Sequence, residues 1–290
     1  MASDRLHISA INYLNPAPLM WSFDHEPERS RLSERYDLSY DTPSECAAKL
    51  ASGAADIGLV PAAAFAANSS LMVIPGCTIA SRDHVKSIIL AVRHPEGIYG
   101  VKRVALDTSS LTSVAYTKIL FAKYWQTTPE FVPHEPNLDT MLENADAALI
   151  IGDPAFVAME SRRKREYRTG QKLVYYDLAH EWHAFTGTVW VSALWGIRPE
   201  SVAATRLSSV EIIRDFERSR DDGMLNIEAL SVEWSKRMMA NSISQTSIRS
   251  YLTENIWYIL DDACLQGLEL FYRYGVECRV LPSIPRLRYL

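Results

Sequence analysis

The stretch LHISAINYLNPAPLM, at residues 6–20, places a strand pattern directly before a helix start and decides the fold. The alternating segment LHISAI is typical of a strand, and the Asn-Pro pair begins a helix, since a proline in the first turn gives up no helical hydrogen bond. The same order continues with a strand at 36–40, a helix from Thr42 and a strand at 56–60. This β-α-β-α-β order predicts a parallel sheet with helices on its faces.

A second unit of strands and helices follows a break at residues 93–98. An apolar strand precedes the break at 87–92, and long amphipathic helices are predicted at 199–220 and 225–240. Further strands are predicted at 101–106, 130–132, 147–151, 173–176 and 188–194, with helices between them.

The last of these strands leads back toward the first unit, which predicts a chain that crosses twice between two lobes. We expect a discontinuous first lobe, residues 1–93 and 196–290, around an inserted second lobe, residues 94–195. The fold class is therefore α/β, with two lobes and a ligand cleft between them at the carboxyl ends of the strands.

Composition excludes several classes of protein. The 290 residues are 48% hydrophobic and 22% charged, which is typical of a chain that buries a full core. A net charge of −5 without a basic face argues against nucleic acid as a partner. No apolar run approaches the roughly 20 residues that span a bilayer, and the N-terminus lacks the pattern of a secretory signal. We expect a cytoplasmic protein without a membrane partner; the oligomeric state cannot be predicted from these features.

Candidate binding residues lie at three predicted strand ends: 12–16, 107–113 and 151–155. The second holds five hydroxyl residues in six positions at a helix start, namely Thr108, Ser109, Ser110, Thr112 and Ser113. Such donors at a helix N-terminus can hold a carboxylate or phosphate without a lysine or arginine. The alternative is plain helix capping, for which one hydroxyl suffices.

Other motifs carry less information. Asp153, in the third strand end, is either a helix cap or an acid/base group. His180 and His183 have HxxH spacing, but no third ligand is nearby in the sequence, so we predict no metal site. Neither a P-loop nor a G-x-G-x-x-G motif is present, and no nucleotide cofactor is expected.

Taken together, six segments resemble the chorismate dehydratases of the futalosine route to menaquinone. The opening INYLNPAPL resembles that family's SYLNxxPL, and the later segments follow in the family's order over most of the first 196 residues. These later segments are DIGLVP at 56–61, Ser87 before an apolar strand, DTSSLTS at 107–113, Gly152-Asp153 and DLAHEWHAFTG at 177–187. The chain departs from the family at Leu111, where arginine is common, at Pro154 and at 188–191. These departures could alter the shape of the cleft.

The resemblance implies a fold like the type 2 periplasmic binding proteins. It also implies dehydration of chorismate to 3-[(1-carboxyvinyl)oxy]benzoate without a metal or redox cofactor. By resemblance, Asn15 and Ser87 are the catalytic pair that contacts the reacting substrate. The remaining site residues, expected to bind substrate, are Tyr13, Pro61, Ser109, Ser110, Thr112, Ser113, Gly152 and Asp153.

Neither an amide nor an alcohol is a base at pH 7. We therefore hypothesise that the enolpyruvyl carboxylate of the substrate takes the ring proton, while Asn15 and Ser87 orient it and stabilise developing charge. Asp153 and His84 are the alternative protein bases. Two other functions stay open: a cytosolic binder of a small anionic solute, and the related enzyme that forms 1,4-dihydroxy-6-naphthoate in the same pathway.

Overall fold

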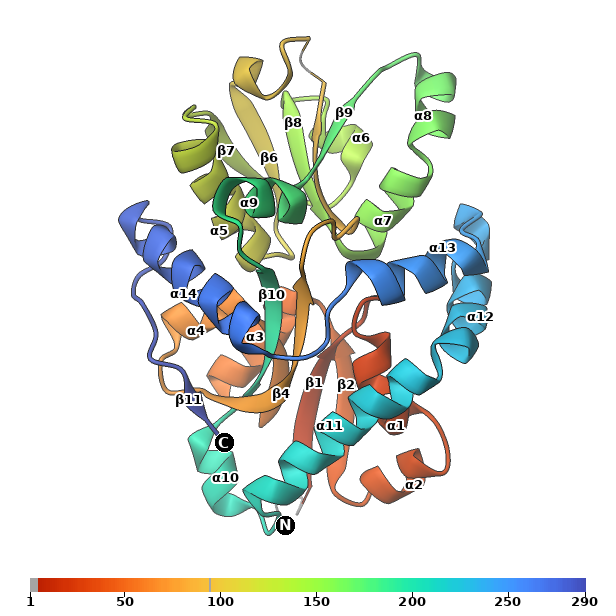
Figure 1. Cartoon of the computed structure of the whole chain (residues 1–290), viewed down its shortest axis with the longest axis vertical. Helices are drawn as coiled ribbons and strands as arrows, with labels where there is room; N and C mark the ends of the chain where they lie inside the picture. Colours follow the sequence, from red (N-terminus) through yellow and green to blue (C-terminus); the bar gives the residue numbers. More distant parts are fainter. Residues whose placement is uncertain (1–4, 94) are drawn as a thin grey trace.

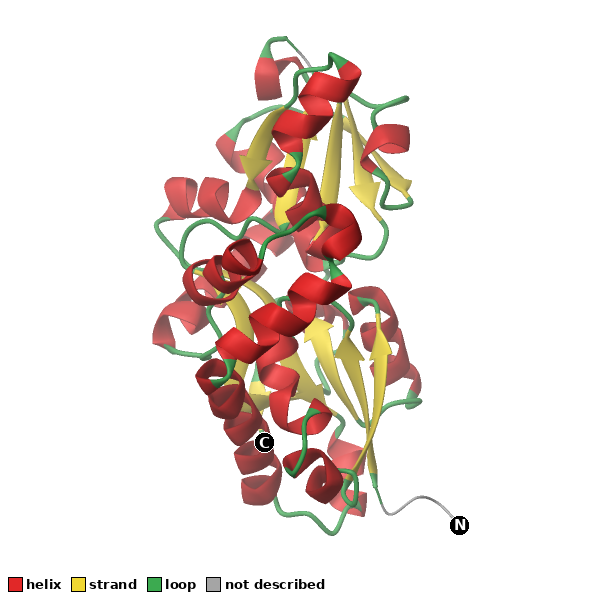
Figure 2. Ribbon diagram, turned by 90° about the vertical axis from the view of Figure 1, so that its right-hand side faces the viewer, coloured by secondary structure: helices red, strands yellow, loops and turns green. Residues whose placement is uncertain are grey.

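The computed structural model describes residues 5–93 and 95–290, and these residues form two α/β lobes, each built around its own sheet (Figures 1 and 2). The first sheet has six strands in the order β11-β4-β10-β3-β1-β2. Their bounds are β1 Leu6–Ile11, β2 Tyr36–Asp41, β3 Ile57–Pro61, β4 Met72–Ser81, β10 Trp190–Ile197 and β11 Arg288–Tyr289. β1 is parallel to β2 and β3, as predicted, but β10 runs antiparallel to β3 and β4. The sheet is therefore mixed rather than wholly parallel.

The second sheet has five strands in the order β7-β6-β8-β5-β9. Their bounds are β5 Ile88–Val92, β6 Arg103–Asp107, β7 Glu130–His134, β8 Ala147–Ile151 and β9 Val174–Asp177. β6 is parallel to β7 and β8, whereas β5 is antiparallel to β8 and β9. Every residue of β5 and β8 is buried, as expected for strands inside a sheet that is covered on both faces.

The helices cover both sheets. Those of the first lobe are η1 Ala17–Met20, α1 Trp21–Asp24, α2 Glu28–Leu32, α3 Pro43–Ser52 and α4 Ala62–Ala67. The second lobe has η2 Gly97–Gly100, α5 Thr112–Ile119, η3 Leu120–Tyr124, α6 Leu138–Met141, α7 Gly152–Glu160, α8 Arg162–Thr169 and α9 Leu178–Thr186. The C-terminal part has α10 Pro199–Ala204, α11 Ser209–Leu225, α12 Ile227–Arg237, η4 Met239–Asn241, α13 Gln245–Ser250, η5 Tyr251–Asn255 and α14 Asp262–Glu277.

Local sequence accounts for the helix ends. α3 begins at Pro43 because the Thr42 side chain accepts from the Glu45 N–H, while the Glu45 side chain accepts from the Thr42 N–H. The prediction of a single long helix at 199–220 is wrong. The helix breaks after α10, and Ser208 starts α11 with a second capping box that pairs it with Glu211.

Sheet membership differs from the expected lobe boundaries at 93/94 and 195/196. β5 was expected in the first lobe but pairs with β8 and β9 of the second sheet. β10 lies mostly within the range expected for the second lobe, but it pairs with β3 and β4 of the first sheet. The chain therefore crosses between the sheets within residues 82–87 and again within 178–189. An apolar run predicts a buried strand but not the sheet to which that strand belongs.

Aromatic packing joins the lobes beside these crossings. Tyr116 of α5 stacks on Trp190 of β10 and on Phe271 of α14, with ring centroids 3.7 and 4.1 Å apart. All three side chains are buried, and α14 lies against both lobes (Figure 1). Within residues 5–93 and 95–290, no helix combines the length and the apolar composition that crossing a bilayer requires.

Candidate functional site

A cavity of ≈ 40 Å³ lies between the lobes, where the carboxyl ends of β1, β3 and β8 meet the start of β5 and the first turn of α5. Both lobes contribute to it, as expected for a site at the ends of parallel strands. Its lining residues are Ile11, Tyr13, Asn15, Pro43, Pro61, Ile79, Ser87, Ile88, Ser110, Thr112, Ser113, Ile151, Gly152, Ser192 and Ala193.

Eight of the ten predicted site residues line this cavity: Tyr13, Asn15, Pro61, Ser87, Ser110, Thr112, Ser113 and Gly152. They come from segments as far apart in the chain as residues 13 and 152. The other two lie outside the lining: Ser109 donates to the Asp107 carboxylate, and Asp153 accepts from the backbone N–H of Leu14.

Ser109 supports the loop before α5. Its hydroxyl donates to Oδ1 of Asp107 at 2.5 Å, and its N–H donates to the same oxygen at 2.9 Å. The other oxygen of Asp107 accepts from the N–H of Ile151 at 3.2 Å, which ties this loop to β8. Burial raises the pKa of the Asp107 carboxyl.

Asp153 ties the two lobes together. Its Oδ1 accepts from the N–H of Leu14, in the first loop of the other lobe, at 2.8 Å. Burial raises the pKa of this carboxyl from 3.8 to about 6. Because the side chain engages Leu14 outside the cavity, this position gives no support to Asp153 as the proton-abstracting base.

The hydroxyl cluster takes the capping role, and two of its hydroxyls keep a hydrogen for a ligand. Ser110 Oγ accepts from the N–H of Ser113 at 3.2 Å, which is the capping role. Thr112 Oγ1 accepts from the N–H of Ala63, in the first lobe, at 3.1 Å. An accepting hydroxyl still has its own hydrogen to donate, so Ser110 and Thr112 keep donors for a ligand in the cavity they line.

Asn15 and Ser87 supply the polar pair of the cavity. Oδ1 of Asn15 is buried and has no hydrogen-bond partner among the described residues. A buried acceptor without a partner is costly unless a ligand or water supplies the donor. Ser87 is buried at the start of β5, and its Oγ accepts from the hydroxyl of Tyr251 at 2.7 Å.

The ring of Tyr13 closes the cavity against the other lobe. Gly152 has φ +64°, and a Cβ built there would lie 2.7 Å from the nearest ring atom of Tyr13. Only glycine allows both this backbone conformation and this close approach. Burial raises the pKa of the Tyr13 hydroxyl, so the ring stays neutral.

No lysine, arginine, aspartate or glutamate is among the described residues that line the cavity. Any positive potential in it must come from the backbone N–H groups at the start of α5 and from neutral hydroxyl and amide donors. Such a lining can bind and orient an anion, but it offers no ionised side chain as a base.

Two polar residues near the site were not predicted. Ser192 lines the cavity from β10, where its Oγ accepts from Nε1 of Trp190 at 2.8 Å. Its position in an otherwise apolar strand was the only signal in the sequence. Tyr251 contacts Ser87 from behind the cavity, and no motif surrounds it.

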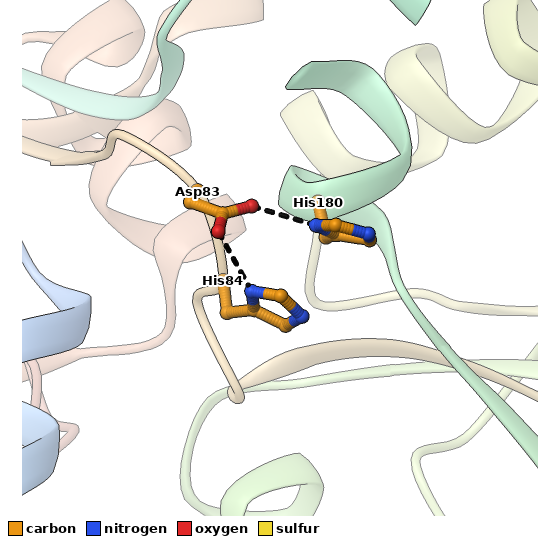
Figure 3. A group of neighbouring side chains, drawn as sticks. All are labelled: Asp83, His84 and His180. Carbon is orange, nitrogen blue, oxygen red and sulfur yellow. Dashed lines mark hydrogen bonds and ion pairs between the residues drawn. The ribbon is translucent and has the colours of Figure 1, made fainter. Parts of the chain in front are cut away.

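His180 belongs to a cluster with Asp83 and His84 rather than with His183, and Figure 3 shows this group. Asp83 forms hydrogen bonds with Nδ1 of His180 at 2.6 Å and contacts Nδ1 of His84 at 3.0 Å. The two imidazoles are stacked, with centroids 4.1 Å apart and planes 22° apart. Both Nδ1 atoms face the Asp83 carboxylate, so we interpret the group as a hydrogen-bonded cluster, although its three ligand-type atoms lie within 4.8 Å of one another. His84 does not line the cavity, which gives no support to it as the base.

Comparison with known proteins identifies relatives over most of the chain. A protein family described as "Menaquinone biosynthesis" matches residues 6–277. A chorismate dehydratase of Thermus thermophilus is 27% identical over 261 residues, which cover 87% of this chain and 90% of that protein.

Solved structures share the fold. A protein of Archaeoglobus fulgidus has a TM-score of 0.71 at 14% identity, over 97% of this chain and 100% of its own. The periplasmic aliphatic sulphonate binding protein of Escherichia coli has a TM-score of 0.62 at 15% identity, over 99% of this chain and 94% of its own. The predicted two-lobed fold of the periplasmic-binding-protein kind is confirmed.

Proposed function

This chain belongs to the menaquinone biosynthesis family, and we propose that it is a chorismate dehydratase that acts in the cytoplasm. The proposed reaction eliminates water from chorismate to give 3-[(1-carboxyvinyl)oxy]benzoate, for the futalosine route. The observation that carries the proposal is the pair formed by Asn15 and Ser87 in one interlobe cavity, with the buried Oδ1 of Asn15 still without a donor. The dehydratase of Thermus thermophilus supports the choice of substrate.

The lining suits a substrate with two carboxylates and a hydroxyl. The hydroxyls of Ser110 and Thr112, with the first N–H groups of α5, offer donors for one carboxylate. Oδ1 of Asn15 is an acceptor for the hydroxyl of the substrate. Neutral donors fixed by the fold stabilise an anion without the mobility of a long charged side chain.

The proposed elimination needs no base from the protein. The enolpyruvyl carboxylate takes the proton from the ring carbon that bears the ether oxygen, and the electrons of that C–H bond complete the aromatic ring. The neighbouring C–O bond breaks, and the departing oxygen takes up the transferred proton and leaves as water. Asn15 and Ser87 hold the carboxylate and the hydroxyl in the geometry that this transfer needs.

Access to the cavity requires movement. Its ≈ 40 Å³ compares with roughly 300–1,000 Å³ for a typical small-molecule site. Separation of the lobes, with withdrawal of the Tyr13 ring from Gly152, would admit the substrate, and closure would then exclude water. The crossings within 82–87 and 178–189 are the segments about which we expect the lobes to turn.

A second candidate is a binder that closes on an anion without changing it. This alternative is favoured by the likeness to the sulphonate-binding protein and by the lack of an ionised side chain among the described lining residues. The naphthoate-forming enzyme of the same pathway is a third candidate, which substrate identity would distinguish.

Incubation of the purified protein with chorismate, with products resolved by mass and absorbance, tests the proposal. We expect loss of one water and a benzoate-type spectrum in the wild type and in Asn12→Leu, because Asn12 lies outside the cavity lining. The Asn15→Leu variant should bind chorismate but leave it unchanged. Binding without turnover by the wild type would establish the solute binder instead.

A further inference from the structure

We infer that Tyr251 is a positioning residue that fixes the direction in which Ser87 donates its hydroxyl hydrogen into the cavity. The inference rests on the proposed function. Tyr251 OH donates to Ser87 Oγ at 2.7 Å, although the two residues are 164 positions apart in the chain. Each is 1% exposed. Ser87 lines the cavity, and Tyr251 lies behind it.

The packing around Tyr251 fixes its hydroxyl. Its ring stacks on Phe156 of α7, with centroids 4.5 Å apart. One turn earlier, Ser247 donates to Glu160 at 2.8 Å, and one turn later Nδ2 of Asn255 donates to the carbonyl of His84 at 2.9 Å. Residues 247, 251 and 255 thus lie on one face of the stretch α13–η5, which Figure 1 shows beside α7. Three hydrogen bonds and one ring stack hold this face against α7 and the crossing segment 82–87.

Each group has one hydroxyl hydrogen, and the direction of the bond follows from their surroundings: among the described residues Tyr251 OH has no acceptor other than Ser87 Oγ, whereas Ser87 borders the cavity. Burial raises the pKa of Tyr251, so its hydroxyl is protonated, and a phenol has one hydrogen to give. That hydrogen occupies one lone pair of Ser87 Oγ. The hydrogen of Ser87 must then point elsewhere, and a group in the cavity can accept it. A hydroxyl that accepts one hydrogen bond also becomes a better donor in the next.

This arrangement gives a neutral serine a defined part in the proposed elimination. Without Tyr251, Ser87 could turn its hydrogen away from the substrate or rotate between positions. With Tyr251, the donor is oriented before the substrate arrives, so no reorientation is needed when the C–O bond breaks. We therefore expect Tyr251 to act on kcat through Ser87, with little effect on substrate binding.

The test is Tyr251→Phe, which keeps the ring and removes only the hydroxyl. We expect kcat for chorismate to fall about tenfold, with KM within about twofold of the wild type. In a Ser87→Ala background the same substitution should cause no further loss, because the group it positions is gone. Tyr258→Phe is the matched control: Tyr258 is also buried, and its hydroxyl has no partner among the described residues.

Three outcomes would overturn the inference while leaving the dehydratase intact. Tyr251→Phe could have the same kcat as Tyr258→Phe, it could raise KM instead of lowering kcat, or it could lower kcat equally with and without Ser87. If the wild type does not convert chorismate at all, the proposed function itself fails, and the inference fails with it.

Discussion

The N–H of Leu14 donates to Oδ1 of Asp153 at 2.8 Å, and this single bond joins the first loop of one lobe to the first turn of α7 in the other. It lies directly behind the cavity, since its neighbours Tyr13 and Gly152 belong to the lining. The carboxylate that accepts it is buried, with its pKa raised to about 6. The contact between the lobes should therefore depend on pH.

The Asp153→Asn variant should remove this pH dependence. A folded-state pKa of about 6, above the ordinary 3.8, means that the folded protein holds a proton which the unfolded chain has lost. The free energy of unfolding should thus fall by roughly 1–3 kcal/mol as the pH rises from about 4 to 6, then stay level. Asparagine keeps the acceptor for Leu14 and has no proton to lose.

Urea unfolding between pH 4 and 8 measures this difference. The exposed Glu143→Gln serves as a control and should follow the wild type at every pH. Parallel curves for the wild type and Asp153→Asn would show that Asp153 does not carry the effect.

Asn15→Leu should separate stability from turnover. Leucine has a similar size and removes the buried Oδ1 that lacks a partner, which should raise the free energy of unfolding by about 1 kcal/mol. It also removes the only side-chain amide among the described residues that line the cavity, so kcat should fall at least 100-fold. Denaturant unfolding and steady-state kinetics measure the two effects. A variant that is both less stable and still active would contradict this account of Asn15.

Gly152→Ala should impair closure of the lobes. Alanine at a positive φ costs about 1–2 kcal/mol, and here its Cβ would also meet the ring of Tyr13. Gly170 provides a matched control, because its φ is +66° but a Cβ there would meet nothing within 4 Å. We expect Gly152→Ala to lower the melting temperature more than Gly170→Ala does, and to be the only one of the two that weakens binding of chorismate. Equal decreases in melting temperature in both variants would mean that the Tyr13 ring moves away from the added Cβ at little cost.

Ser110→Ala should act on binding rather than on chemistry. It removes the acceptor for the N–H of Ser113 and one donor at the start of α5, so KM for chorismate should rise about tenfold with kcat within about threefold. Ser208→Ala is a suitable control, since Ser208 caps α11 in a similar way and is not part of the cavity lining. A fall in kcat without a change in KM would assign Ser110 a different role.

The sequence predicted the local pieces of this protein better than their assembly. The alternation of strand and helix around residues 6–60 is confirmed because hydrophobic period, capping residues and turn residues agree there. β4 was not predicted, since Pro75 and Gly76 interrupt its apolar pattern. The sheets to which β5 and β10 belong depend on pairing between distant segments, on which periodicity has no bearing.

In the candidate site, too, features set by local sequence were predicted and features set by long-range contacts were not. Residues at strand ends, such as Asn15, Ser110 and Gly152, converge because the carboxyl ends of parallel strands in both sheets border the same cavity. Asp153 lies beside them in sequence, but its side chain accepts from Leu14 behind the cavity, and side-chain direction is not encoded in spacing. Tyr251 reaches Ser87 from a helical stretch that was assigned no role, so only the tertiary structure reveals it.

The position of β10 in the first sheet also affects the order in which the two lobes can fold during synthesis. β10 lies between β4 and β3 in the first sheet, yet the whole second sheet is encoded between β4 and β10. A nascent chain that has not reached residue 190 holds β3 and β4 without the strand that separates them, and each has an edge open to wrong partners. The lobe that leaves the ribosome first is therefore the lobe that completes its sheet last.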